Sequence, residues 1–170
     1  MHTDTPQSLA THLQQSGEQL VFAESCTAGL ASARLASVAG ISQHLCGSAV
    51  VYQIPTKVAW LNIAPALIDQ HGYVSEEVAI AMSEGVLDLT SHATIAAAIT
   101  GDLGPNASPR TDGTAWIAII SRDHRRLTKL VELPATIPDN QAEDGITLRL
   151  YRQRAAVELL LQTVIEFLET

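Results

Sequence analysis

The stretch at residues 20–42 constrains the fold of this chain most strongly. Four apolar residues, 20–23, run into Glu24, Ser25, Cys26 and Thr27, and an alanine-rich pattern with helical spacing follows. A short apolar run that is closed by small polar residues and followed by helical spacing is typical of a strand, a tight turn and a helix. Because the first N–H groups of a helix are free and carry the positive end of its dipole, we expect this turn to favour an activated nucleophile or a bound anion.

The rest of the chain alternates between helical patterns and short apolar runs of strand length. Ser75 is a favourable N-cap residue, and Val78, Met82, Val86 and Leu89 follow it at helical spacing. Strands are expected at 46–52, 93–99, 114–121 and 127–133, the last two as a hairpin, and further helices at 8–16, 56–61, 64–70 and 146–169. This order predicts one domain over residues 1–170, a layered α/β/α fold with a mixed, largely parallel sheet and a C-terminal helix.

Composition excludes several classes of protein. The net charge of -8 argues against a nucleic-acid partner or an anionic membrane surface. No apolar stretch approaches the roughly 20 residues that span a bilayer, and residues 1–15 lack the pattern of a signal peptide, so we expect a cytoplasmic protein. A chain of 170 residues can bury a normal core without metal or disulfides, and we expect Cys26 and Cys46 to be reduced.

Ser25 and Lys57 are the strongest candidates for a catalytic pair. A serine hydroxyl is a weak nucleophile until a base removes its proton, and burial can lower the lysine pKa from about 10.4 towards 7 or 8. Lys57 is expected in the first turn of a helix just beyond a strand. Judged by spacing alone, Ser25 is more often a cap or turn residue, and Lys57 more often an exposed lysine.

Two neighbours of this pair have alternative roles. Tyr52 lies five residues before Lys57, where it either packs at the end of a strand or orients the lysine or the leaving group. Cys26 is the rival nucleophile because a helix N-terminus lowers the pKa of a thiol. Since no histidine is placed near it by sequence, we interpret Cys26 as a buried, inert thiol.

A long loop and two arginines are candidates for binding an anion. Residues 101–113 are dense in Gly, Pro, Asn, Asp and Ser, and loops of this length tend to be functional. Thr100 and Gly101 begin the loop, whose N–H groups can point at a phosphate or an oxyanion. Arg110 and Arg152 could close such a pocket, because guanidinium groups bind phosphate bidentately, although most arginines in such positions are only solvated. The six histidines show no zinc-binding spacing, and we expect no metal.

The segment Ala23-Glu24-Ser25-Cys26-Thr27, with the glycine that follows, resembles the signature of the CinA C-terminal domain family. Further segments match the family in order and spacing from about residue 20 to residue 120. They are Gly40-Ile41-Ser42, Gly47 to Tyr52 with Lys57, Gly72 to Glu77 leading to Met82, Thr100-Gly101 and Gly104-Pro105.

The resemblance implies an amidohydrolase that converts nicotinamide mononucleotide to nicotinate mononucleotide and ammonia in pyridine-nucleotide salvage. It implies a nucleophilic Ser25, a base at Lys57 and a supporting Tyr52, with no cofactor and a small-molecule nucleotide as the substrate. The residues expected to bind the substrate are Cys26, Thr27, Ser42, Thr100, Gly101, Arg110 and Arg152. Relatives suggest a homodimer.

The chain departs from the family pattern close to the expected site. Ala28 replaces a glycine, Ile54 replaces a polar residue after the tyrosine, and Asp102-Leu103 replaces an apolar residue and an alanine. Leu148 takes the place of one of two family arginines, which leaves Arg152. Two alternatives to the deamidase therefore stay open, a hydrolase that acts on a different amide and a catalytically silent binding or regulatory relative.

Overall fold

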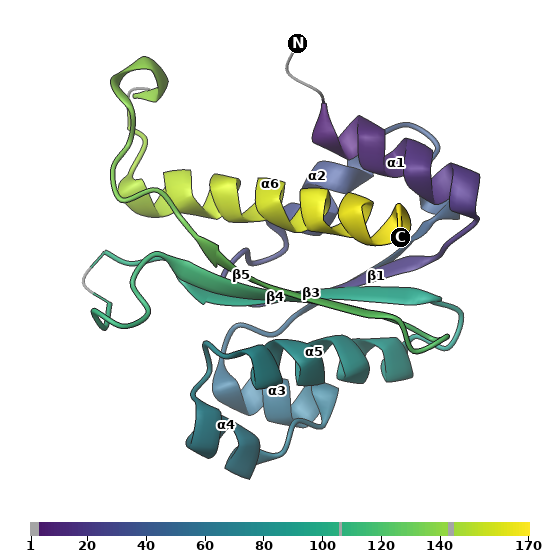
Figure 1. Cartoon of the computed structure of the whole chain (residues 1–170), viewed down its shortest axis with the longest axis horizontal. Helices are drawn as coiled ribbons and strands as arrows, with labels where there is room; N and C mark the ends of the chain where they lie inside the picture. Colours follow the sequence, from purple (N-terminus) through teal and green to yellow (C-terminus); the bar gives the residue numbers. More distant parts are fainter. Residues whose placement is uncertain (1–3, 106, 143–144) are drawn as a thin grey trace.

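A central sheet lies between two layers of helices in the computed structural model, which describes residues 4–105, 107–142 and 145–170. Helices α1, α2 and α6 cover one face of the sheet, and α3, α4 and α5 cover the other (Figure 1). The strands are β1 (Leu20–Glu24), β2 (Leu45–Val50), β3 (Ile95–Asp102), β4 (Thr114–Ser121) and β5 (Arg126–Glu132). The helices are α1 (Thr5–Ser16), α2 (Leu30–Ala36), α3 (Ile54–Leu61), α4 (Pro65–His71), α5 (Glu76–Leu89) and α6 (Leu148–Leu168), with short 3₁₀ helices η1 (Ile41–Gln43) and η2 (Asp139–Gln141).

The described strands form one mixed sheet in the order β2-β1-β3-β4-β5. Strand β1 pairs in parallel with both β2 and β3, whereas β3 with β4 and β4 with β5 pair antiparallel. The layered α/β fold, the mixed sheet, the C-terminal helix and the β4–β5 hairpin are therefore confirmed. Among the described strands, β4 runs opposite to the other four, so the sheet is mixed and largely parallel as expected, with the parallel neighbours confined to the three strands around β1.

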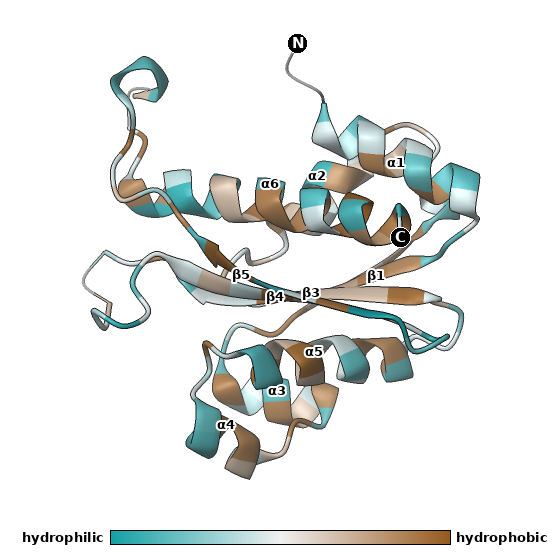
Figure 2. Cartoon of the chain, viewed as in Figure 1, coloured by the Kyte–Doolittle hydropathy of each residue, from teal (hydrophilic) through white to brown (hydrophobic). Residues whose placement is uncertain are grey.

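The two faces of the sheet contact separate apolar cores. Along β1, Phe22 packs with residues of α1, α2 and α6, while Val21 and Ala23 pack with residues of α3, α4 and α5. This alternation follows from the two-residue period of a strand, and it gives a strand buried on both faces an almost unbroken apolar sequence. Hydrophobic segments accordingly line the inner sides of both helical layers (Figure 2). Among the described helices, none combines the length and the apolar character that crossing a bilayer requires.

Local signals set most element boundaries, and the differences have local causes. Ser75 caps α5 as predicted, since its Oγ accepts a hydrogen bond from the Val78 amide at 3.3 Å. Helix α3 begins two residues earlier than expected, at Ile54, because Pro55 is tolerated in a first turn that needs no internal N–H donor. Strand β3 continues to Asp102, so the loop before β4 is shorter than the expected 101–113.

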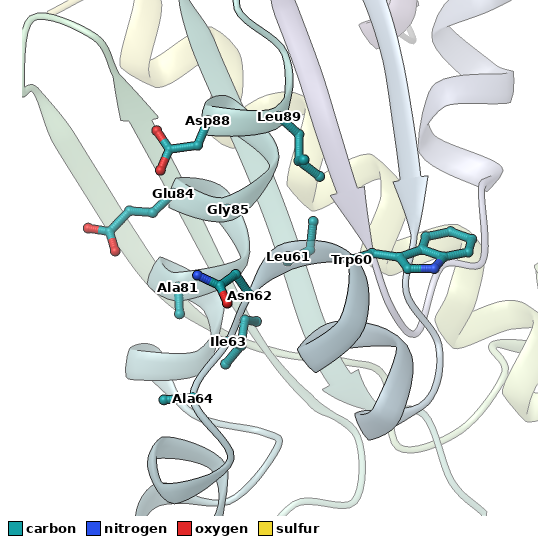
Figure 3. A pocket seen from close by; sticks show the side chains of 10 residues that line it. All are labelled: Trp60, Leu61, Asn62, Ile63, Ala64, Ala81, Glu84, Gly85, Asp88 and Leu89. Atoms are coloured by element: carbon teal, nitrogen blue, oxygen red, sulfur yellow. The ribbon is translucent and has the colours of Figure 1, made fainter.

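Helices α3 and α5 approach closely at Gly85. A Cβ atom added there would lie 2.4 Å from the Leu61 carbonyl oxygen and 2.8 Å from the Leu61 Cβ. Figure 3 shows Gly85 beside Leu61 and Asn62, at the point where α3 ends. Glycine at this position therefore lets the backbone of α3 approach α5.

We expect Gly85→Ala to lower the free energy of unfolding by about 1–3 kcal/mol, because the new methyl group overpacks the α3–α5 contact. The higher helix propensity of alanine, about 1 kcal/mol, acts in the opposite direction. Urea unfolding followed by circular dichroism measures the difference, with Glu84→Ala at the exposed neighbouring position as the control. An unfolding midpoint for Gly85→Ala at or above that of the wild type would contradict the prediction.

Candidate active site

Ser25 and Lys57 meet at the carboxyl end of β1. Ser25 directly follows the last residue of β1, and its amide donates to the Ile99 carbonyl of β3 at 3.1 Å. Lys57 lies in the first turn of α3, and its Nζ is 2.8 Å from Ser25 Oγ. The structure thus brings together two residues that are 32 positions apart in the sequence.

The amine of Lys57 is buried among neutral oxygen atoms. Its side chain is 1% exposed, and Nζ donates to the carbonyls of Val51 at 2.8 Å and Tyr52 at 3.4 Å. Among the described residues, no carboxylate forms an ion pair with it. Burial lowers the pKa of Lys57 to about 8, because removing the amine from water disfavours its charged form.

The contacts of Lys57 suit a neutral amine. A neutral amine has two N–H donors and one lone pair. The two carbonyls can accept both N–H groups, which leaves the lone pair free to accept the Ser25 hydroxyl proton. This arrangement is the one that a general base needs.

Glu24 organises the turn that carries Ser25. Its carboxylate is fully buried, and Oε2 accepts from the Thr27 hydroxyl at 2.8 Å and from the Gly29 and Ala31 amides at 3.0 Å. Oε1 accepts from the Ser32 amide and the Ser48 hydroxyl, both at 3.0 Å. The amides at the start of α2 are therefore taken by Glu24, which corrects the expectation that they stay free for a bound anion.

The side chains of Cys26 and Thr27 are both buried. Cys26 is 4% exposed and belongs to the core beneath α6, and burial raises the pKa of its thiol to about 12. The predicted inert thiol agrees with this environment. Thr27 is fully buried and donates to Glu24, while the carbonyls of both residues accept from Gln153 Nε2 at 3.2 and 3.3 Å. These two side chains support the turn.

Tyr52 is held by Arg149, a residue that the motifs of the sequence do not indicate. Arg149 Nη2 donates to the Tyr52 hydroxyl at 2.7 Å, and Nη1 donates to the Gly104 carbonyl at 2.8 Å. Arg149 is the second residue of α6, next to Leu148, so the start of α6 does supply an arginine to this site. The spacing of Arg149 and Arg152, three residues apart on a helix, is the signal that places both on one face.

Thr100 and Gly101 are parts of β3 and its packing. Thr100 is fully buried and donates to the Tyr73 carbonyl at 2.7 Å. At Gly101 a Cβ atom would lie 2.5 Å from the Ala115 Cβ, so glycine allows close packing of β3 on β4. Asp102 accepts hydrogen bonds from the hydroxyls of Tyr73 at 3.2 Å and Thr111 at 3.1 Å, and it thereby joins two loops.

The two predicted phosphate-binding arginines have different environments. Arg152 is 4% exposed, and its guanidinium donates to Asp112 Oδ1 at 3.1 Å, to the Leu103 carbonyl at 3.2 Å and to the Pro134 carbonyl at 2.8 Å. It holds the surrounding loops together, and three of its five N–H donors are already used by these contacts. Arg110 is exposed and lines a separate cavity.

Ser42 is not brought to the Ser25–Lys57 pair. It lies in η1, before the start of β2, and the first residue of β2 pairs with Leu20 at the start of β1. Ser25 follows the other end of β1, so the two serines are separated by the length of that strand, roughly 15 Å. In the described part of the chain, no three His, Cys, Asp or Glu side chains gather to hold a metal ion.

Two of the departures from the family pattern flank Ser25 and Lys57. Ala28 has a φ of 53°, a conformation that glycine adopts with less strain. Ile54 is 43% exposed at the start of α3. Leu103, by contrast, is buried in the core beneath α6, so it contributes no surface for a ligand.

Comparison with known proteins finds relatives that match most of this chain. The chain is 40% identical over 140 residues to a CinA-like protein of Mycobacterium tuberculosis (strain H37Ra), covering 81% of this chain and 32% of that protein. It is 38% identical over 144 residues to a CinA-like protein of Mycobacterium sp. (strain JLS), covering 84% of this chain and 34% of that protein. The chain thus spans about a third of the length of these curated relatives.

Solved structures show the same fold. A CinA superfamily protein from Klebsiella pneumoniae is 26% identical with a TM-score of 0.85, and the match covers 99% of both chains. A competence/damage-inducible protein from Agrobacterium tumefaciens is 26% identical with a TM-score of 0.83, covering 98% of this chain and 94% of that one. The family model for the CinA C-terminal domain matches residues 2–147. This chain therefore belongs to the CinA C-terminal domain family.

Proposed function

We propose that this protein is an amidohydrolase that deamidates nicotinamide mononucleotide to nicotinate mononucleotide and ammonia, in salvage of pyridine nucleotides. The observation that carries the proposal is the 2.8 Å contact between Ser25 Oγ and the buried Lys57 Nζ. The resemblance to the family suggests the substrate, and the geometry supports the assignment of Ser25 as the nucleophile and Lys57 as its base.

The proposed reaction has two steps. Ser25 Oγ attacks the carboxamide carbon while neutral Lys57 takes its proton, and the C–N bond then breaks as Lys57 delivers that proton to the departing ammonia. Water next attacks the acyl-serine ester, again with Lys57 as the base, and releases the carboxylate and free Ser25. No oxidant, metal or cofactor enters this balance.

The Cys26 amide is the proposed donor to the oxyanion that forms in both steps. Cys26 directly follows the nucleophile in the turn, and backbone N–H groups at this position stabilise oxyanions in other nucleophile turns. In the described part of the chain, no backbone carbonyl accepts a hydrogen bond from this amide, and the Cys26 hydrogen bond to Gln153 uses the Cys26 carbonyl.

The alternatives differ in how well they fit the pair. A catalytically silent relative has no need of a buried lysine in contact with a serine, so the contact favours an enzyme. A hydrolase that acts on another amide keeps the same chemistry, and Asp102 remains the departure that motivates it. The homodimer and the cytoplasmic location stay predictions.

Incubating the purified protein with nicotinamide mononucleotide tests the proposal. We expect ammonia and nicotinate mononucleotide to appear in equal amounts, the first measured by a glutamate dehydrogenase assay and the second by chromatography. Absence of both products, from a sample shown to be folded by circular dichroism, would overturn the proposal. Turnover confined to amides that are not nucleotides would favour the alternative hydrolase.

The pH dependence of the reaction reports on Lys57. Burial lowers the lysine pKa to about 8, and only the neutral amine can act as the base. Below this pH, kcat/KM should therefore fall about tenfold per pH unit, and above it kcat/KM should level off. A profile measured between pH 6 and 10 would contradict this role if kcat/KM were flat or fell on passing pH 8.

A further inference from the structure

A cavity of about 500 Å³, which neither Ser25 nor Lys57 lines, has no part in the proposed chemistry. Tyr73, Trp116 and Leu130 are among its apolar lining residues, and Ser108, Arg110 and Thr111 are among its polar ones. Tyr73 and Leu130 are 45% and 50% exposed, respectively. The cavity is therefore open to solvent and offers two aromatic rings and one guanidinium group.

The cavity is on the same face of the sheet as Ser25 and in register with it. The Ser25 amide bonds to the Ile99 carbonyl, and the next residue of β3, Thr100, pairs with Trp116 of β4. Because directly paired residues share a face of the sheet, Trp116 lies on the same face as Thr100. The Thr100 hydroxyl bonds to the Tyr73 carbonyl, on the face of the sheet that α3 and Lys57 cover (Figure 1). Ser25 and Trp116 are separated by two strand spacings, or roughly 10 Å. A single heteroaromatic ring is too short to bridge this distance, whereas a nucleotide is long enough.

The walls of the cavity are fixed by internal hydrogen bonds. The Asp102 carboxylate accepts from the Tyr73 hydroxyl at 3.2 Å and from the Thr111 hydroxyl at 3.1 Å. Burial raises the pKa of Tyr73, and the Asp102 charge acts in the same direction, so this phenol remains a donor. The Tyr73 carbonyl is held by Thr100 at 2.7 Å.

The charges around the cavity leave Arg110 available to an anion. Among the described residues, no carboxylate forms an ion pair with its guanidinium. His71, which also lines the cavity, is paired with Glu77 at 3.1 Å, and the two Asp102 contacts above occupy that carboxylate. In a protein with a net charge of -8, Arg110 is thus the local group that can bind a phosphate.

We propose that this cavity is a subsite for a nucleoside monophosphate group, with the base against Trp116 and Tyr73 and the phosphate at Arg110. The group is either a free nucleotide or the second half of a dinucleotide amide whose carboxamide reaches Ser25. The proposed binding of a nucleotide depends only on the cavity, whereas the proposal that this nucleotide is half of a dinucleotide substrate rests on the proposed amidase function.

Tryptophan fluorescence can measure binding without any turnover. The chain has two tryptophans, and Trp60→Phe leaves Trp116 as the only one. In this background we expect adenosine monophosphate to quench the emission saturably, and Arg110→Gln to raise its Kd about tenfold or more. Arg126→Gln removes an exposed arginine that is not part of the cavity lining and should leave the Kd unchanged.

Three results would overturn the proposal. They are no saturable quenching by adenosine monophosphate, the same Kd in the Arg110→Gln and Arg126→Gln variants, and inorganic phosphate binding as tightly as the nucleotide. The last would show a phosphate site with no role for the aromatic rings. Because these measurements need no activity, their failure is distinct from failure of the amidase proposal.

Kinetics then distinguish the two sources of the nucleotide. If the cavity holds half of the substrate, Arg110→Gln should lower kcat/KM about tenfold for the dinucleotide amide, relative to Arg126→Gln. If it holds a free nucleotide, kcat/KM for the dinucleotide should be equal in both variants while adenosine monophosphate still quenches Trp116. Both results support the subsite, and they assign its ligand.

Discussion

Ser25→Ala should abolish ammonia release from nicotinamide mononucleotide, with kcat reduced by about 10³-fold or more. The substitution removes the only atom that forms the proposed covalent bond, and loss of a nucleophile in a serine hydrolase costs up to about 10⁶-fold. The fold should persist, because the substitution removes only the hydroxyl group that contacts Lys57 Nζ, and this group lies just beyond the end of β1. Circular dichroism and urea unfolding check this, and ammonia release measures the activity.

Lys57→Met should give a loss of similar size, and the double variant should lose little more. Residues that act as one unit give strongly non-additive losses, because either substitution already removes the same covalent step. Ser91→Ala provides a matched control, since Ser91 is an exposed serine in the turn before β3. If Ser25→Ala kept more than a tenth of the wild-type kcat, Ser25 would not be the nucleophile.

Cys26→Ala separates the two candidate nucleophiles. The thiol is buried and its pKa is about 12, so very little thiolate exists near neutral pH. This variant should keep its activity if it folds, whereas a loss as large as that of Ser25→Ala would point to the thiol.

Local patterns were sufficient for most of the secondary structure. The helix capped by Ser75 and the hairpin of β4 and β5 follow from signals within a few residues of each other. Sheet order could not be predicted in the same way. That β1 lies between β2 and β3 depends on how two helical crossovers pack, which involves contacts between distant segments.

The sequence predicts the pair of Ser25 and Lys57, because segments that resemble the family carry both residues. It does not predict which side chains surround the pair. Arg152 shows why, since its acceptors are a carboxylate and two carbonyls from separate loops. No spacing in the sequence reveals that these loops meet. An arginine that is buried between loops and an arginine that is free to bind phosphate therefore have the same local sequence pattern. The spacing of Arg149 places it on the same helix face as Arg152, but it does not reveal that its partners Tyr52 and Gly104, which come from two other segments, meet there.

Glu24 is the residue whose importance was least visible in the sequence. The sequence indicates only a residue of a polar turn, yet the Glu24 carboxylate accepts hydrogen bonds from five donors in the turn, α2 and β2. A buried carboxylate is stable only when such donors replace its lost hydration. The charge that the helix dipole favours at the start of α2 is thus supplied by the protein itself, and the same bonds fix the position of Ser25.

Glu24→Ala should therefore lower the free energy of unfolding by about 3–5 kcal/mol, since it leaves buried donors without an acceptor. Glu24→Gln should cost less, about 1–2 kcal/mol. Its carbonyl can keep the three bonds of Oε2, and the Ser48 hydroxyl can rotate to accept from the new amide. The Ser32 amide alone would then face another donor.

Urea unfolding measures these changes. Glu132 provides the matched control, because it is also the last residue of a strand, β5, but it is exposed, whereas Glu24 at the end of β1 is buried. Glu132→Ala should change stability by less than about 0.5 kcal/mol, as is usual for surface substitutions. If Glu24 positions the nucleophile, Glu24→Gln should also lower kcat more than it raises KM, because the defect lies in the alignment of Ser25 with Lys57. Equal unfolding midpoints for Glu24→Ala and Glu132→Ala would show that the five hydrogen bonds do not hold this turn in place.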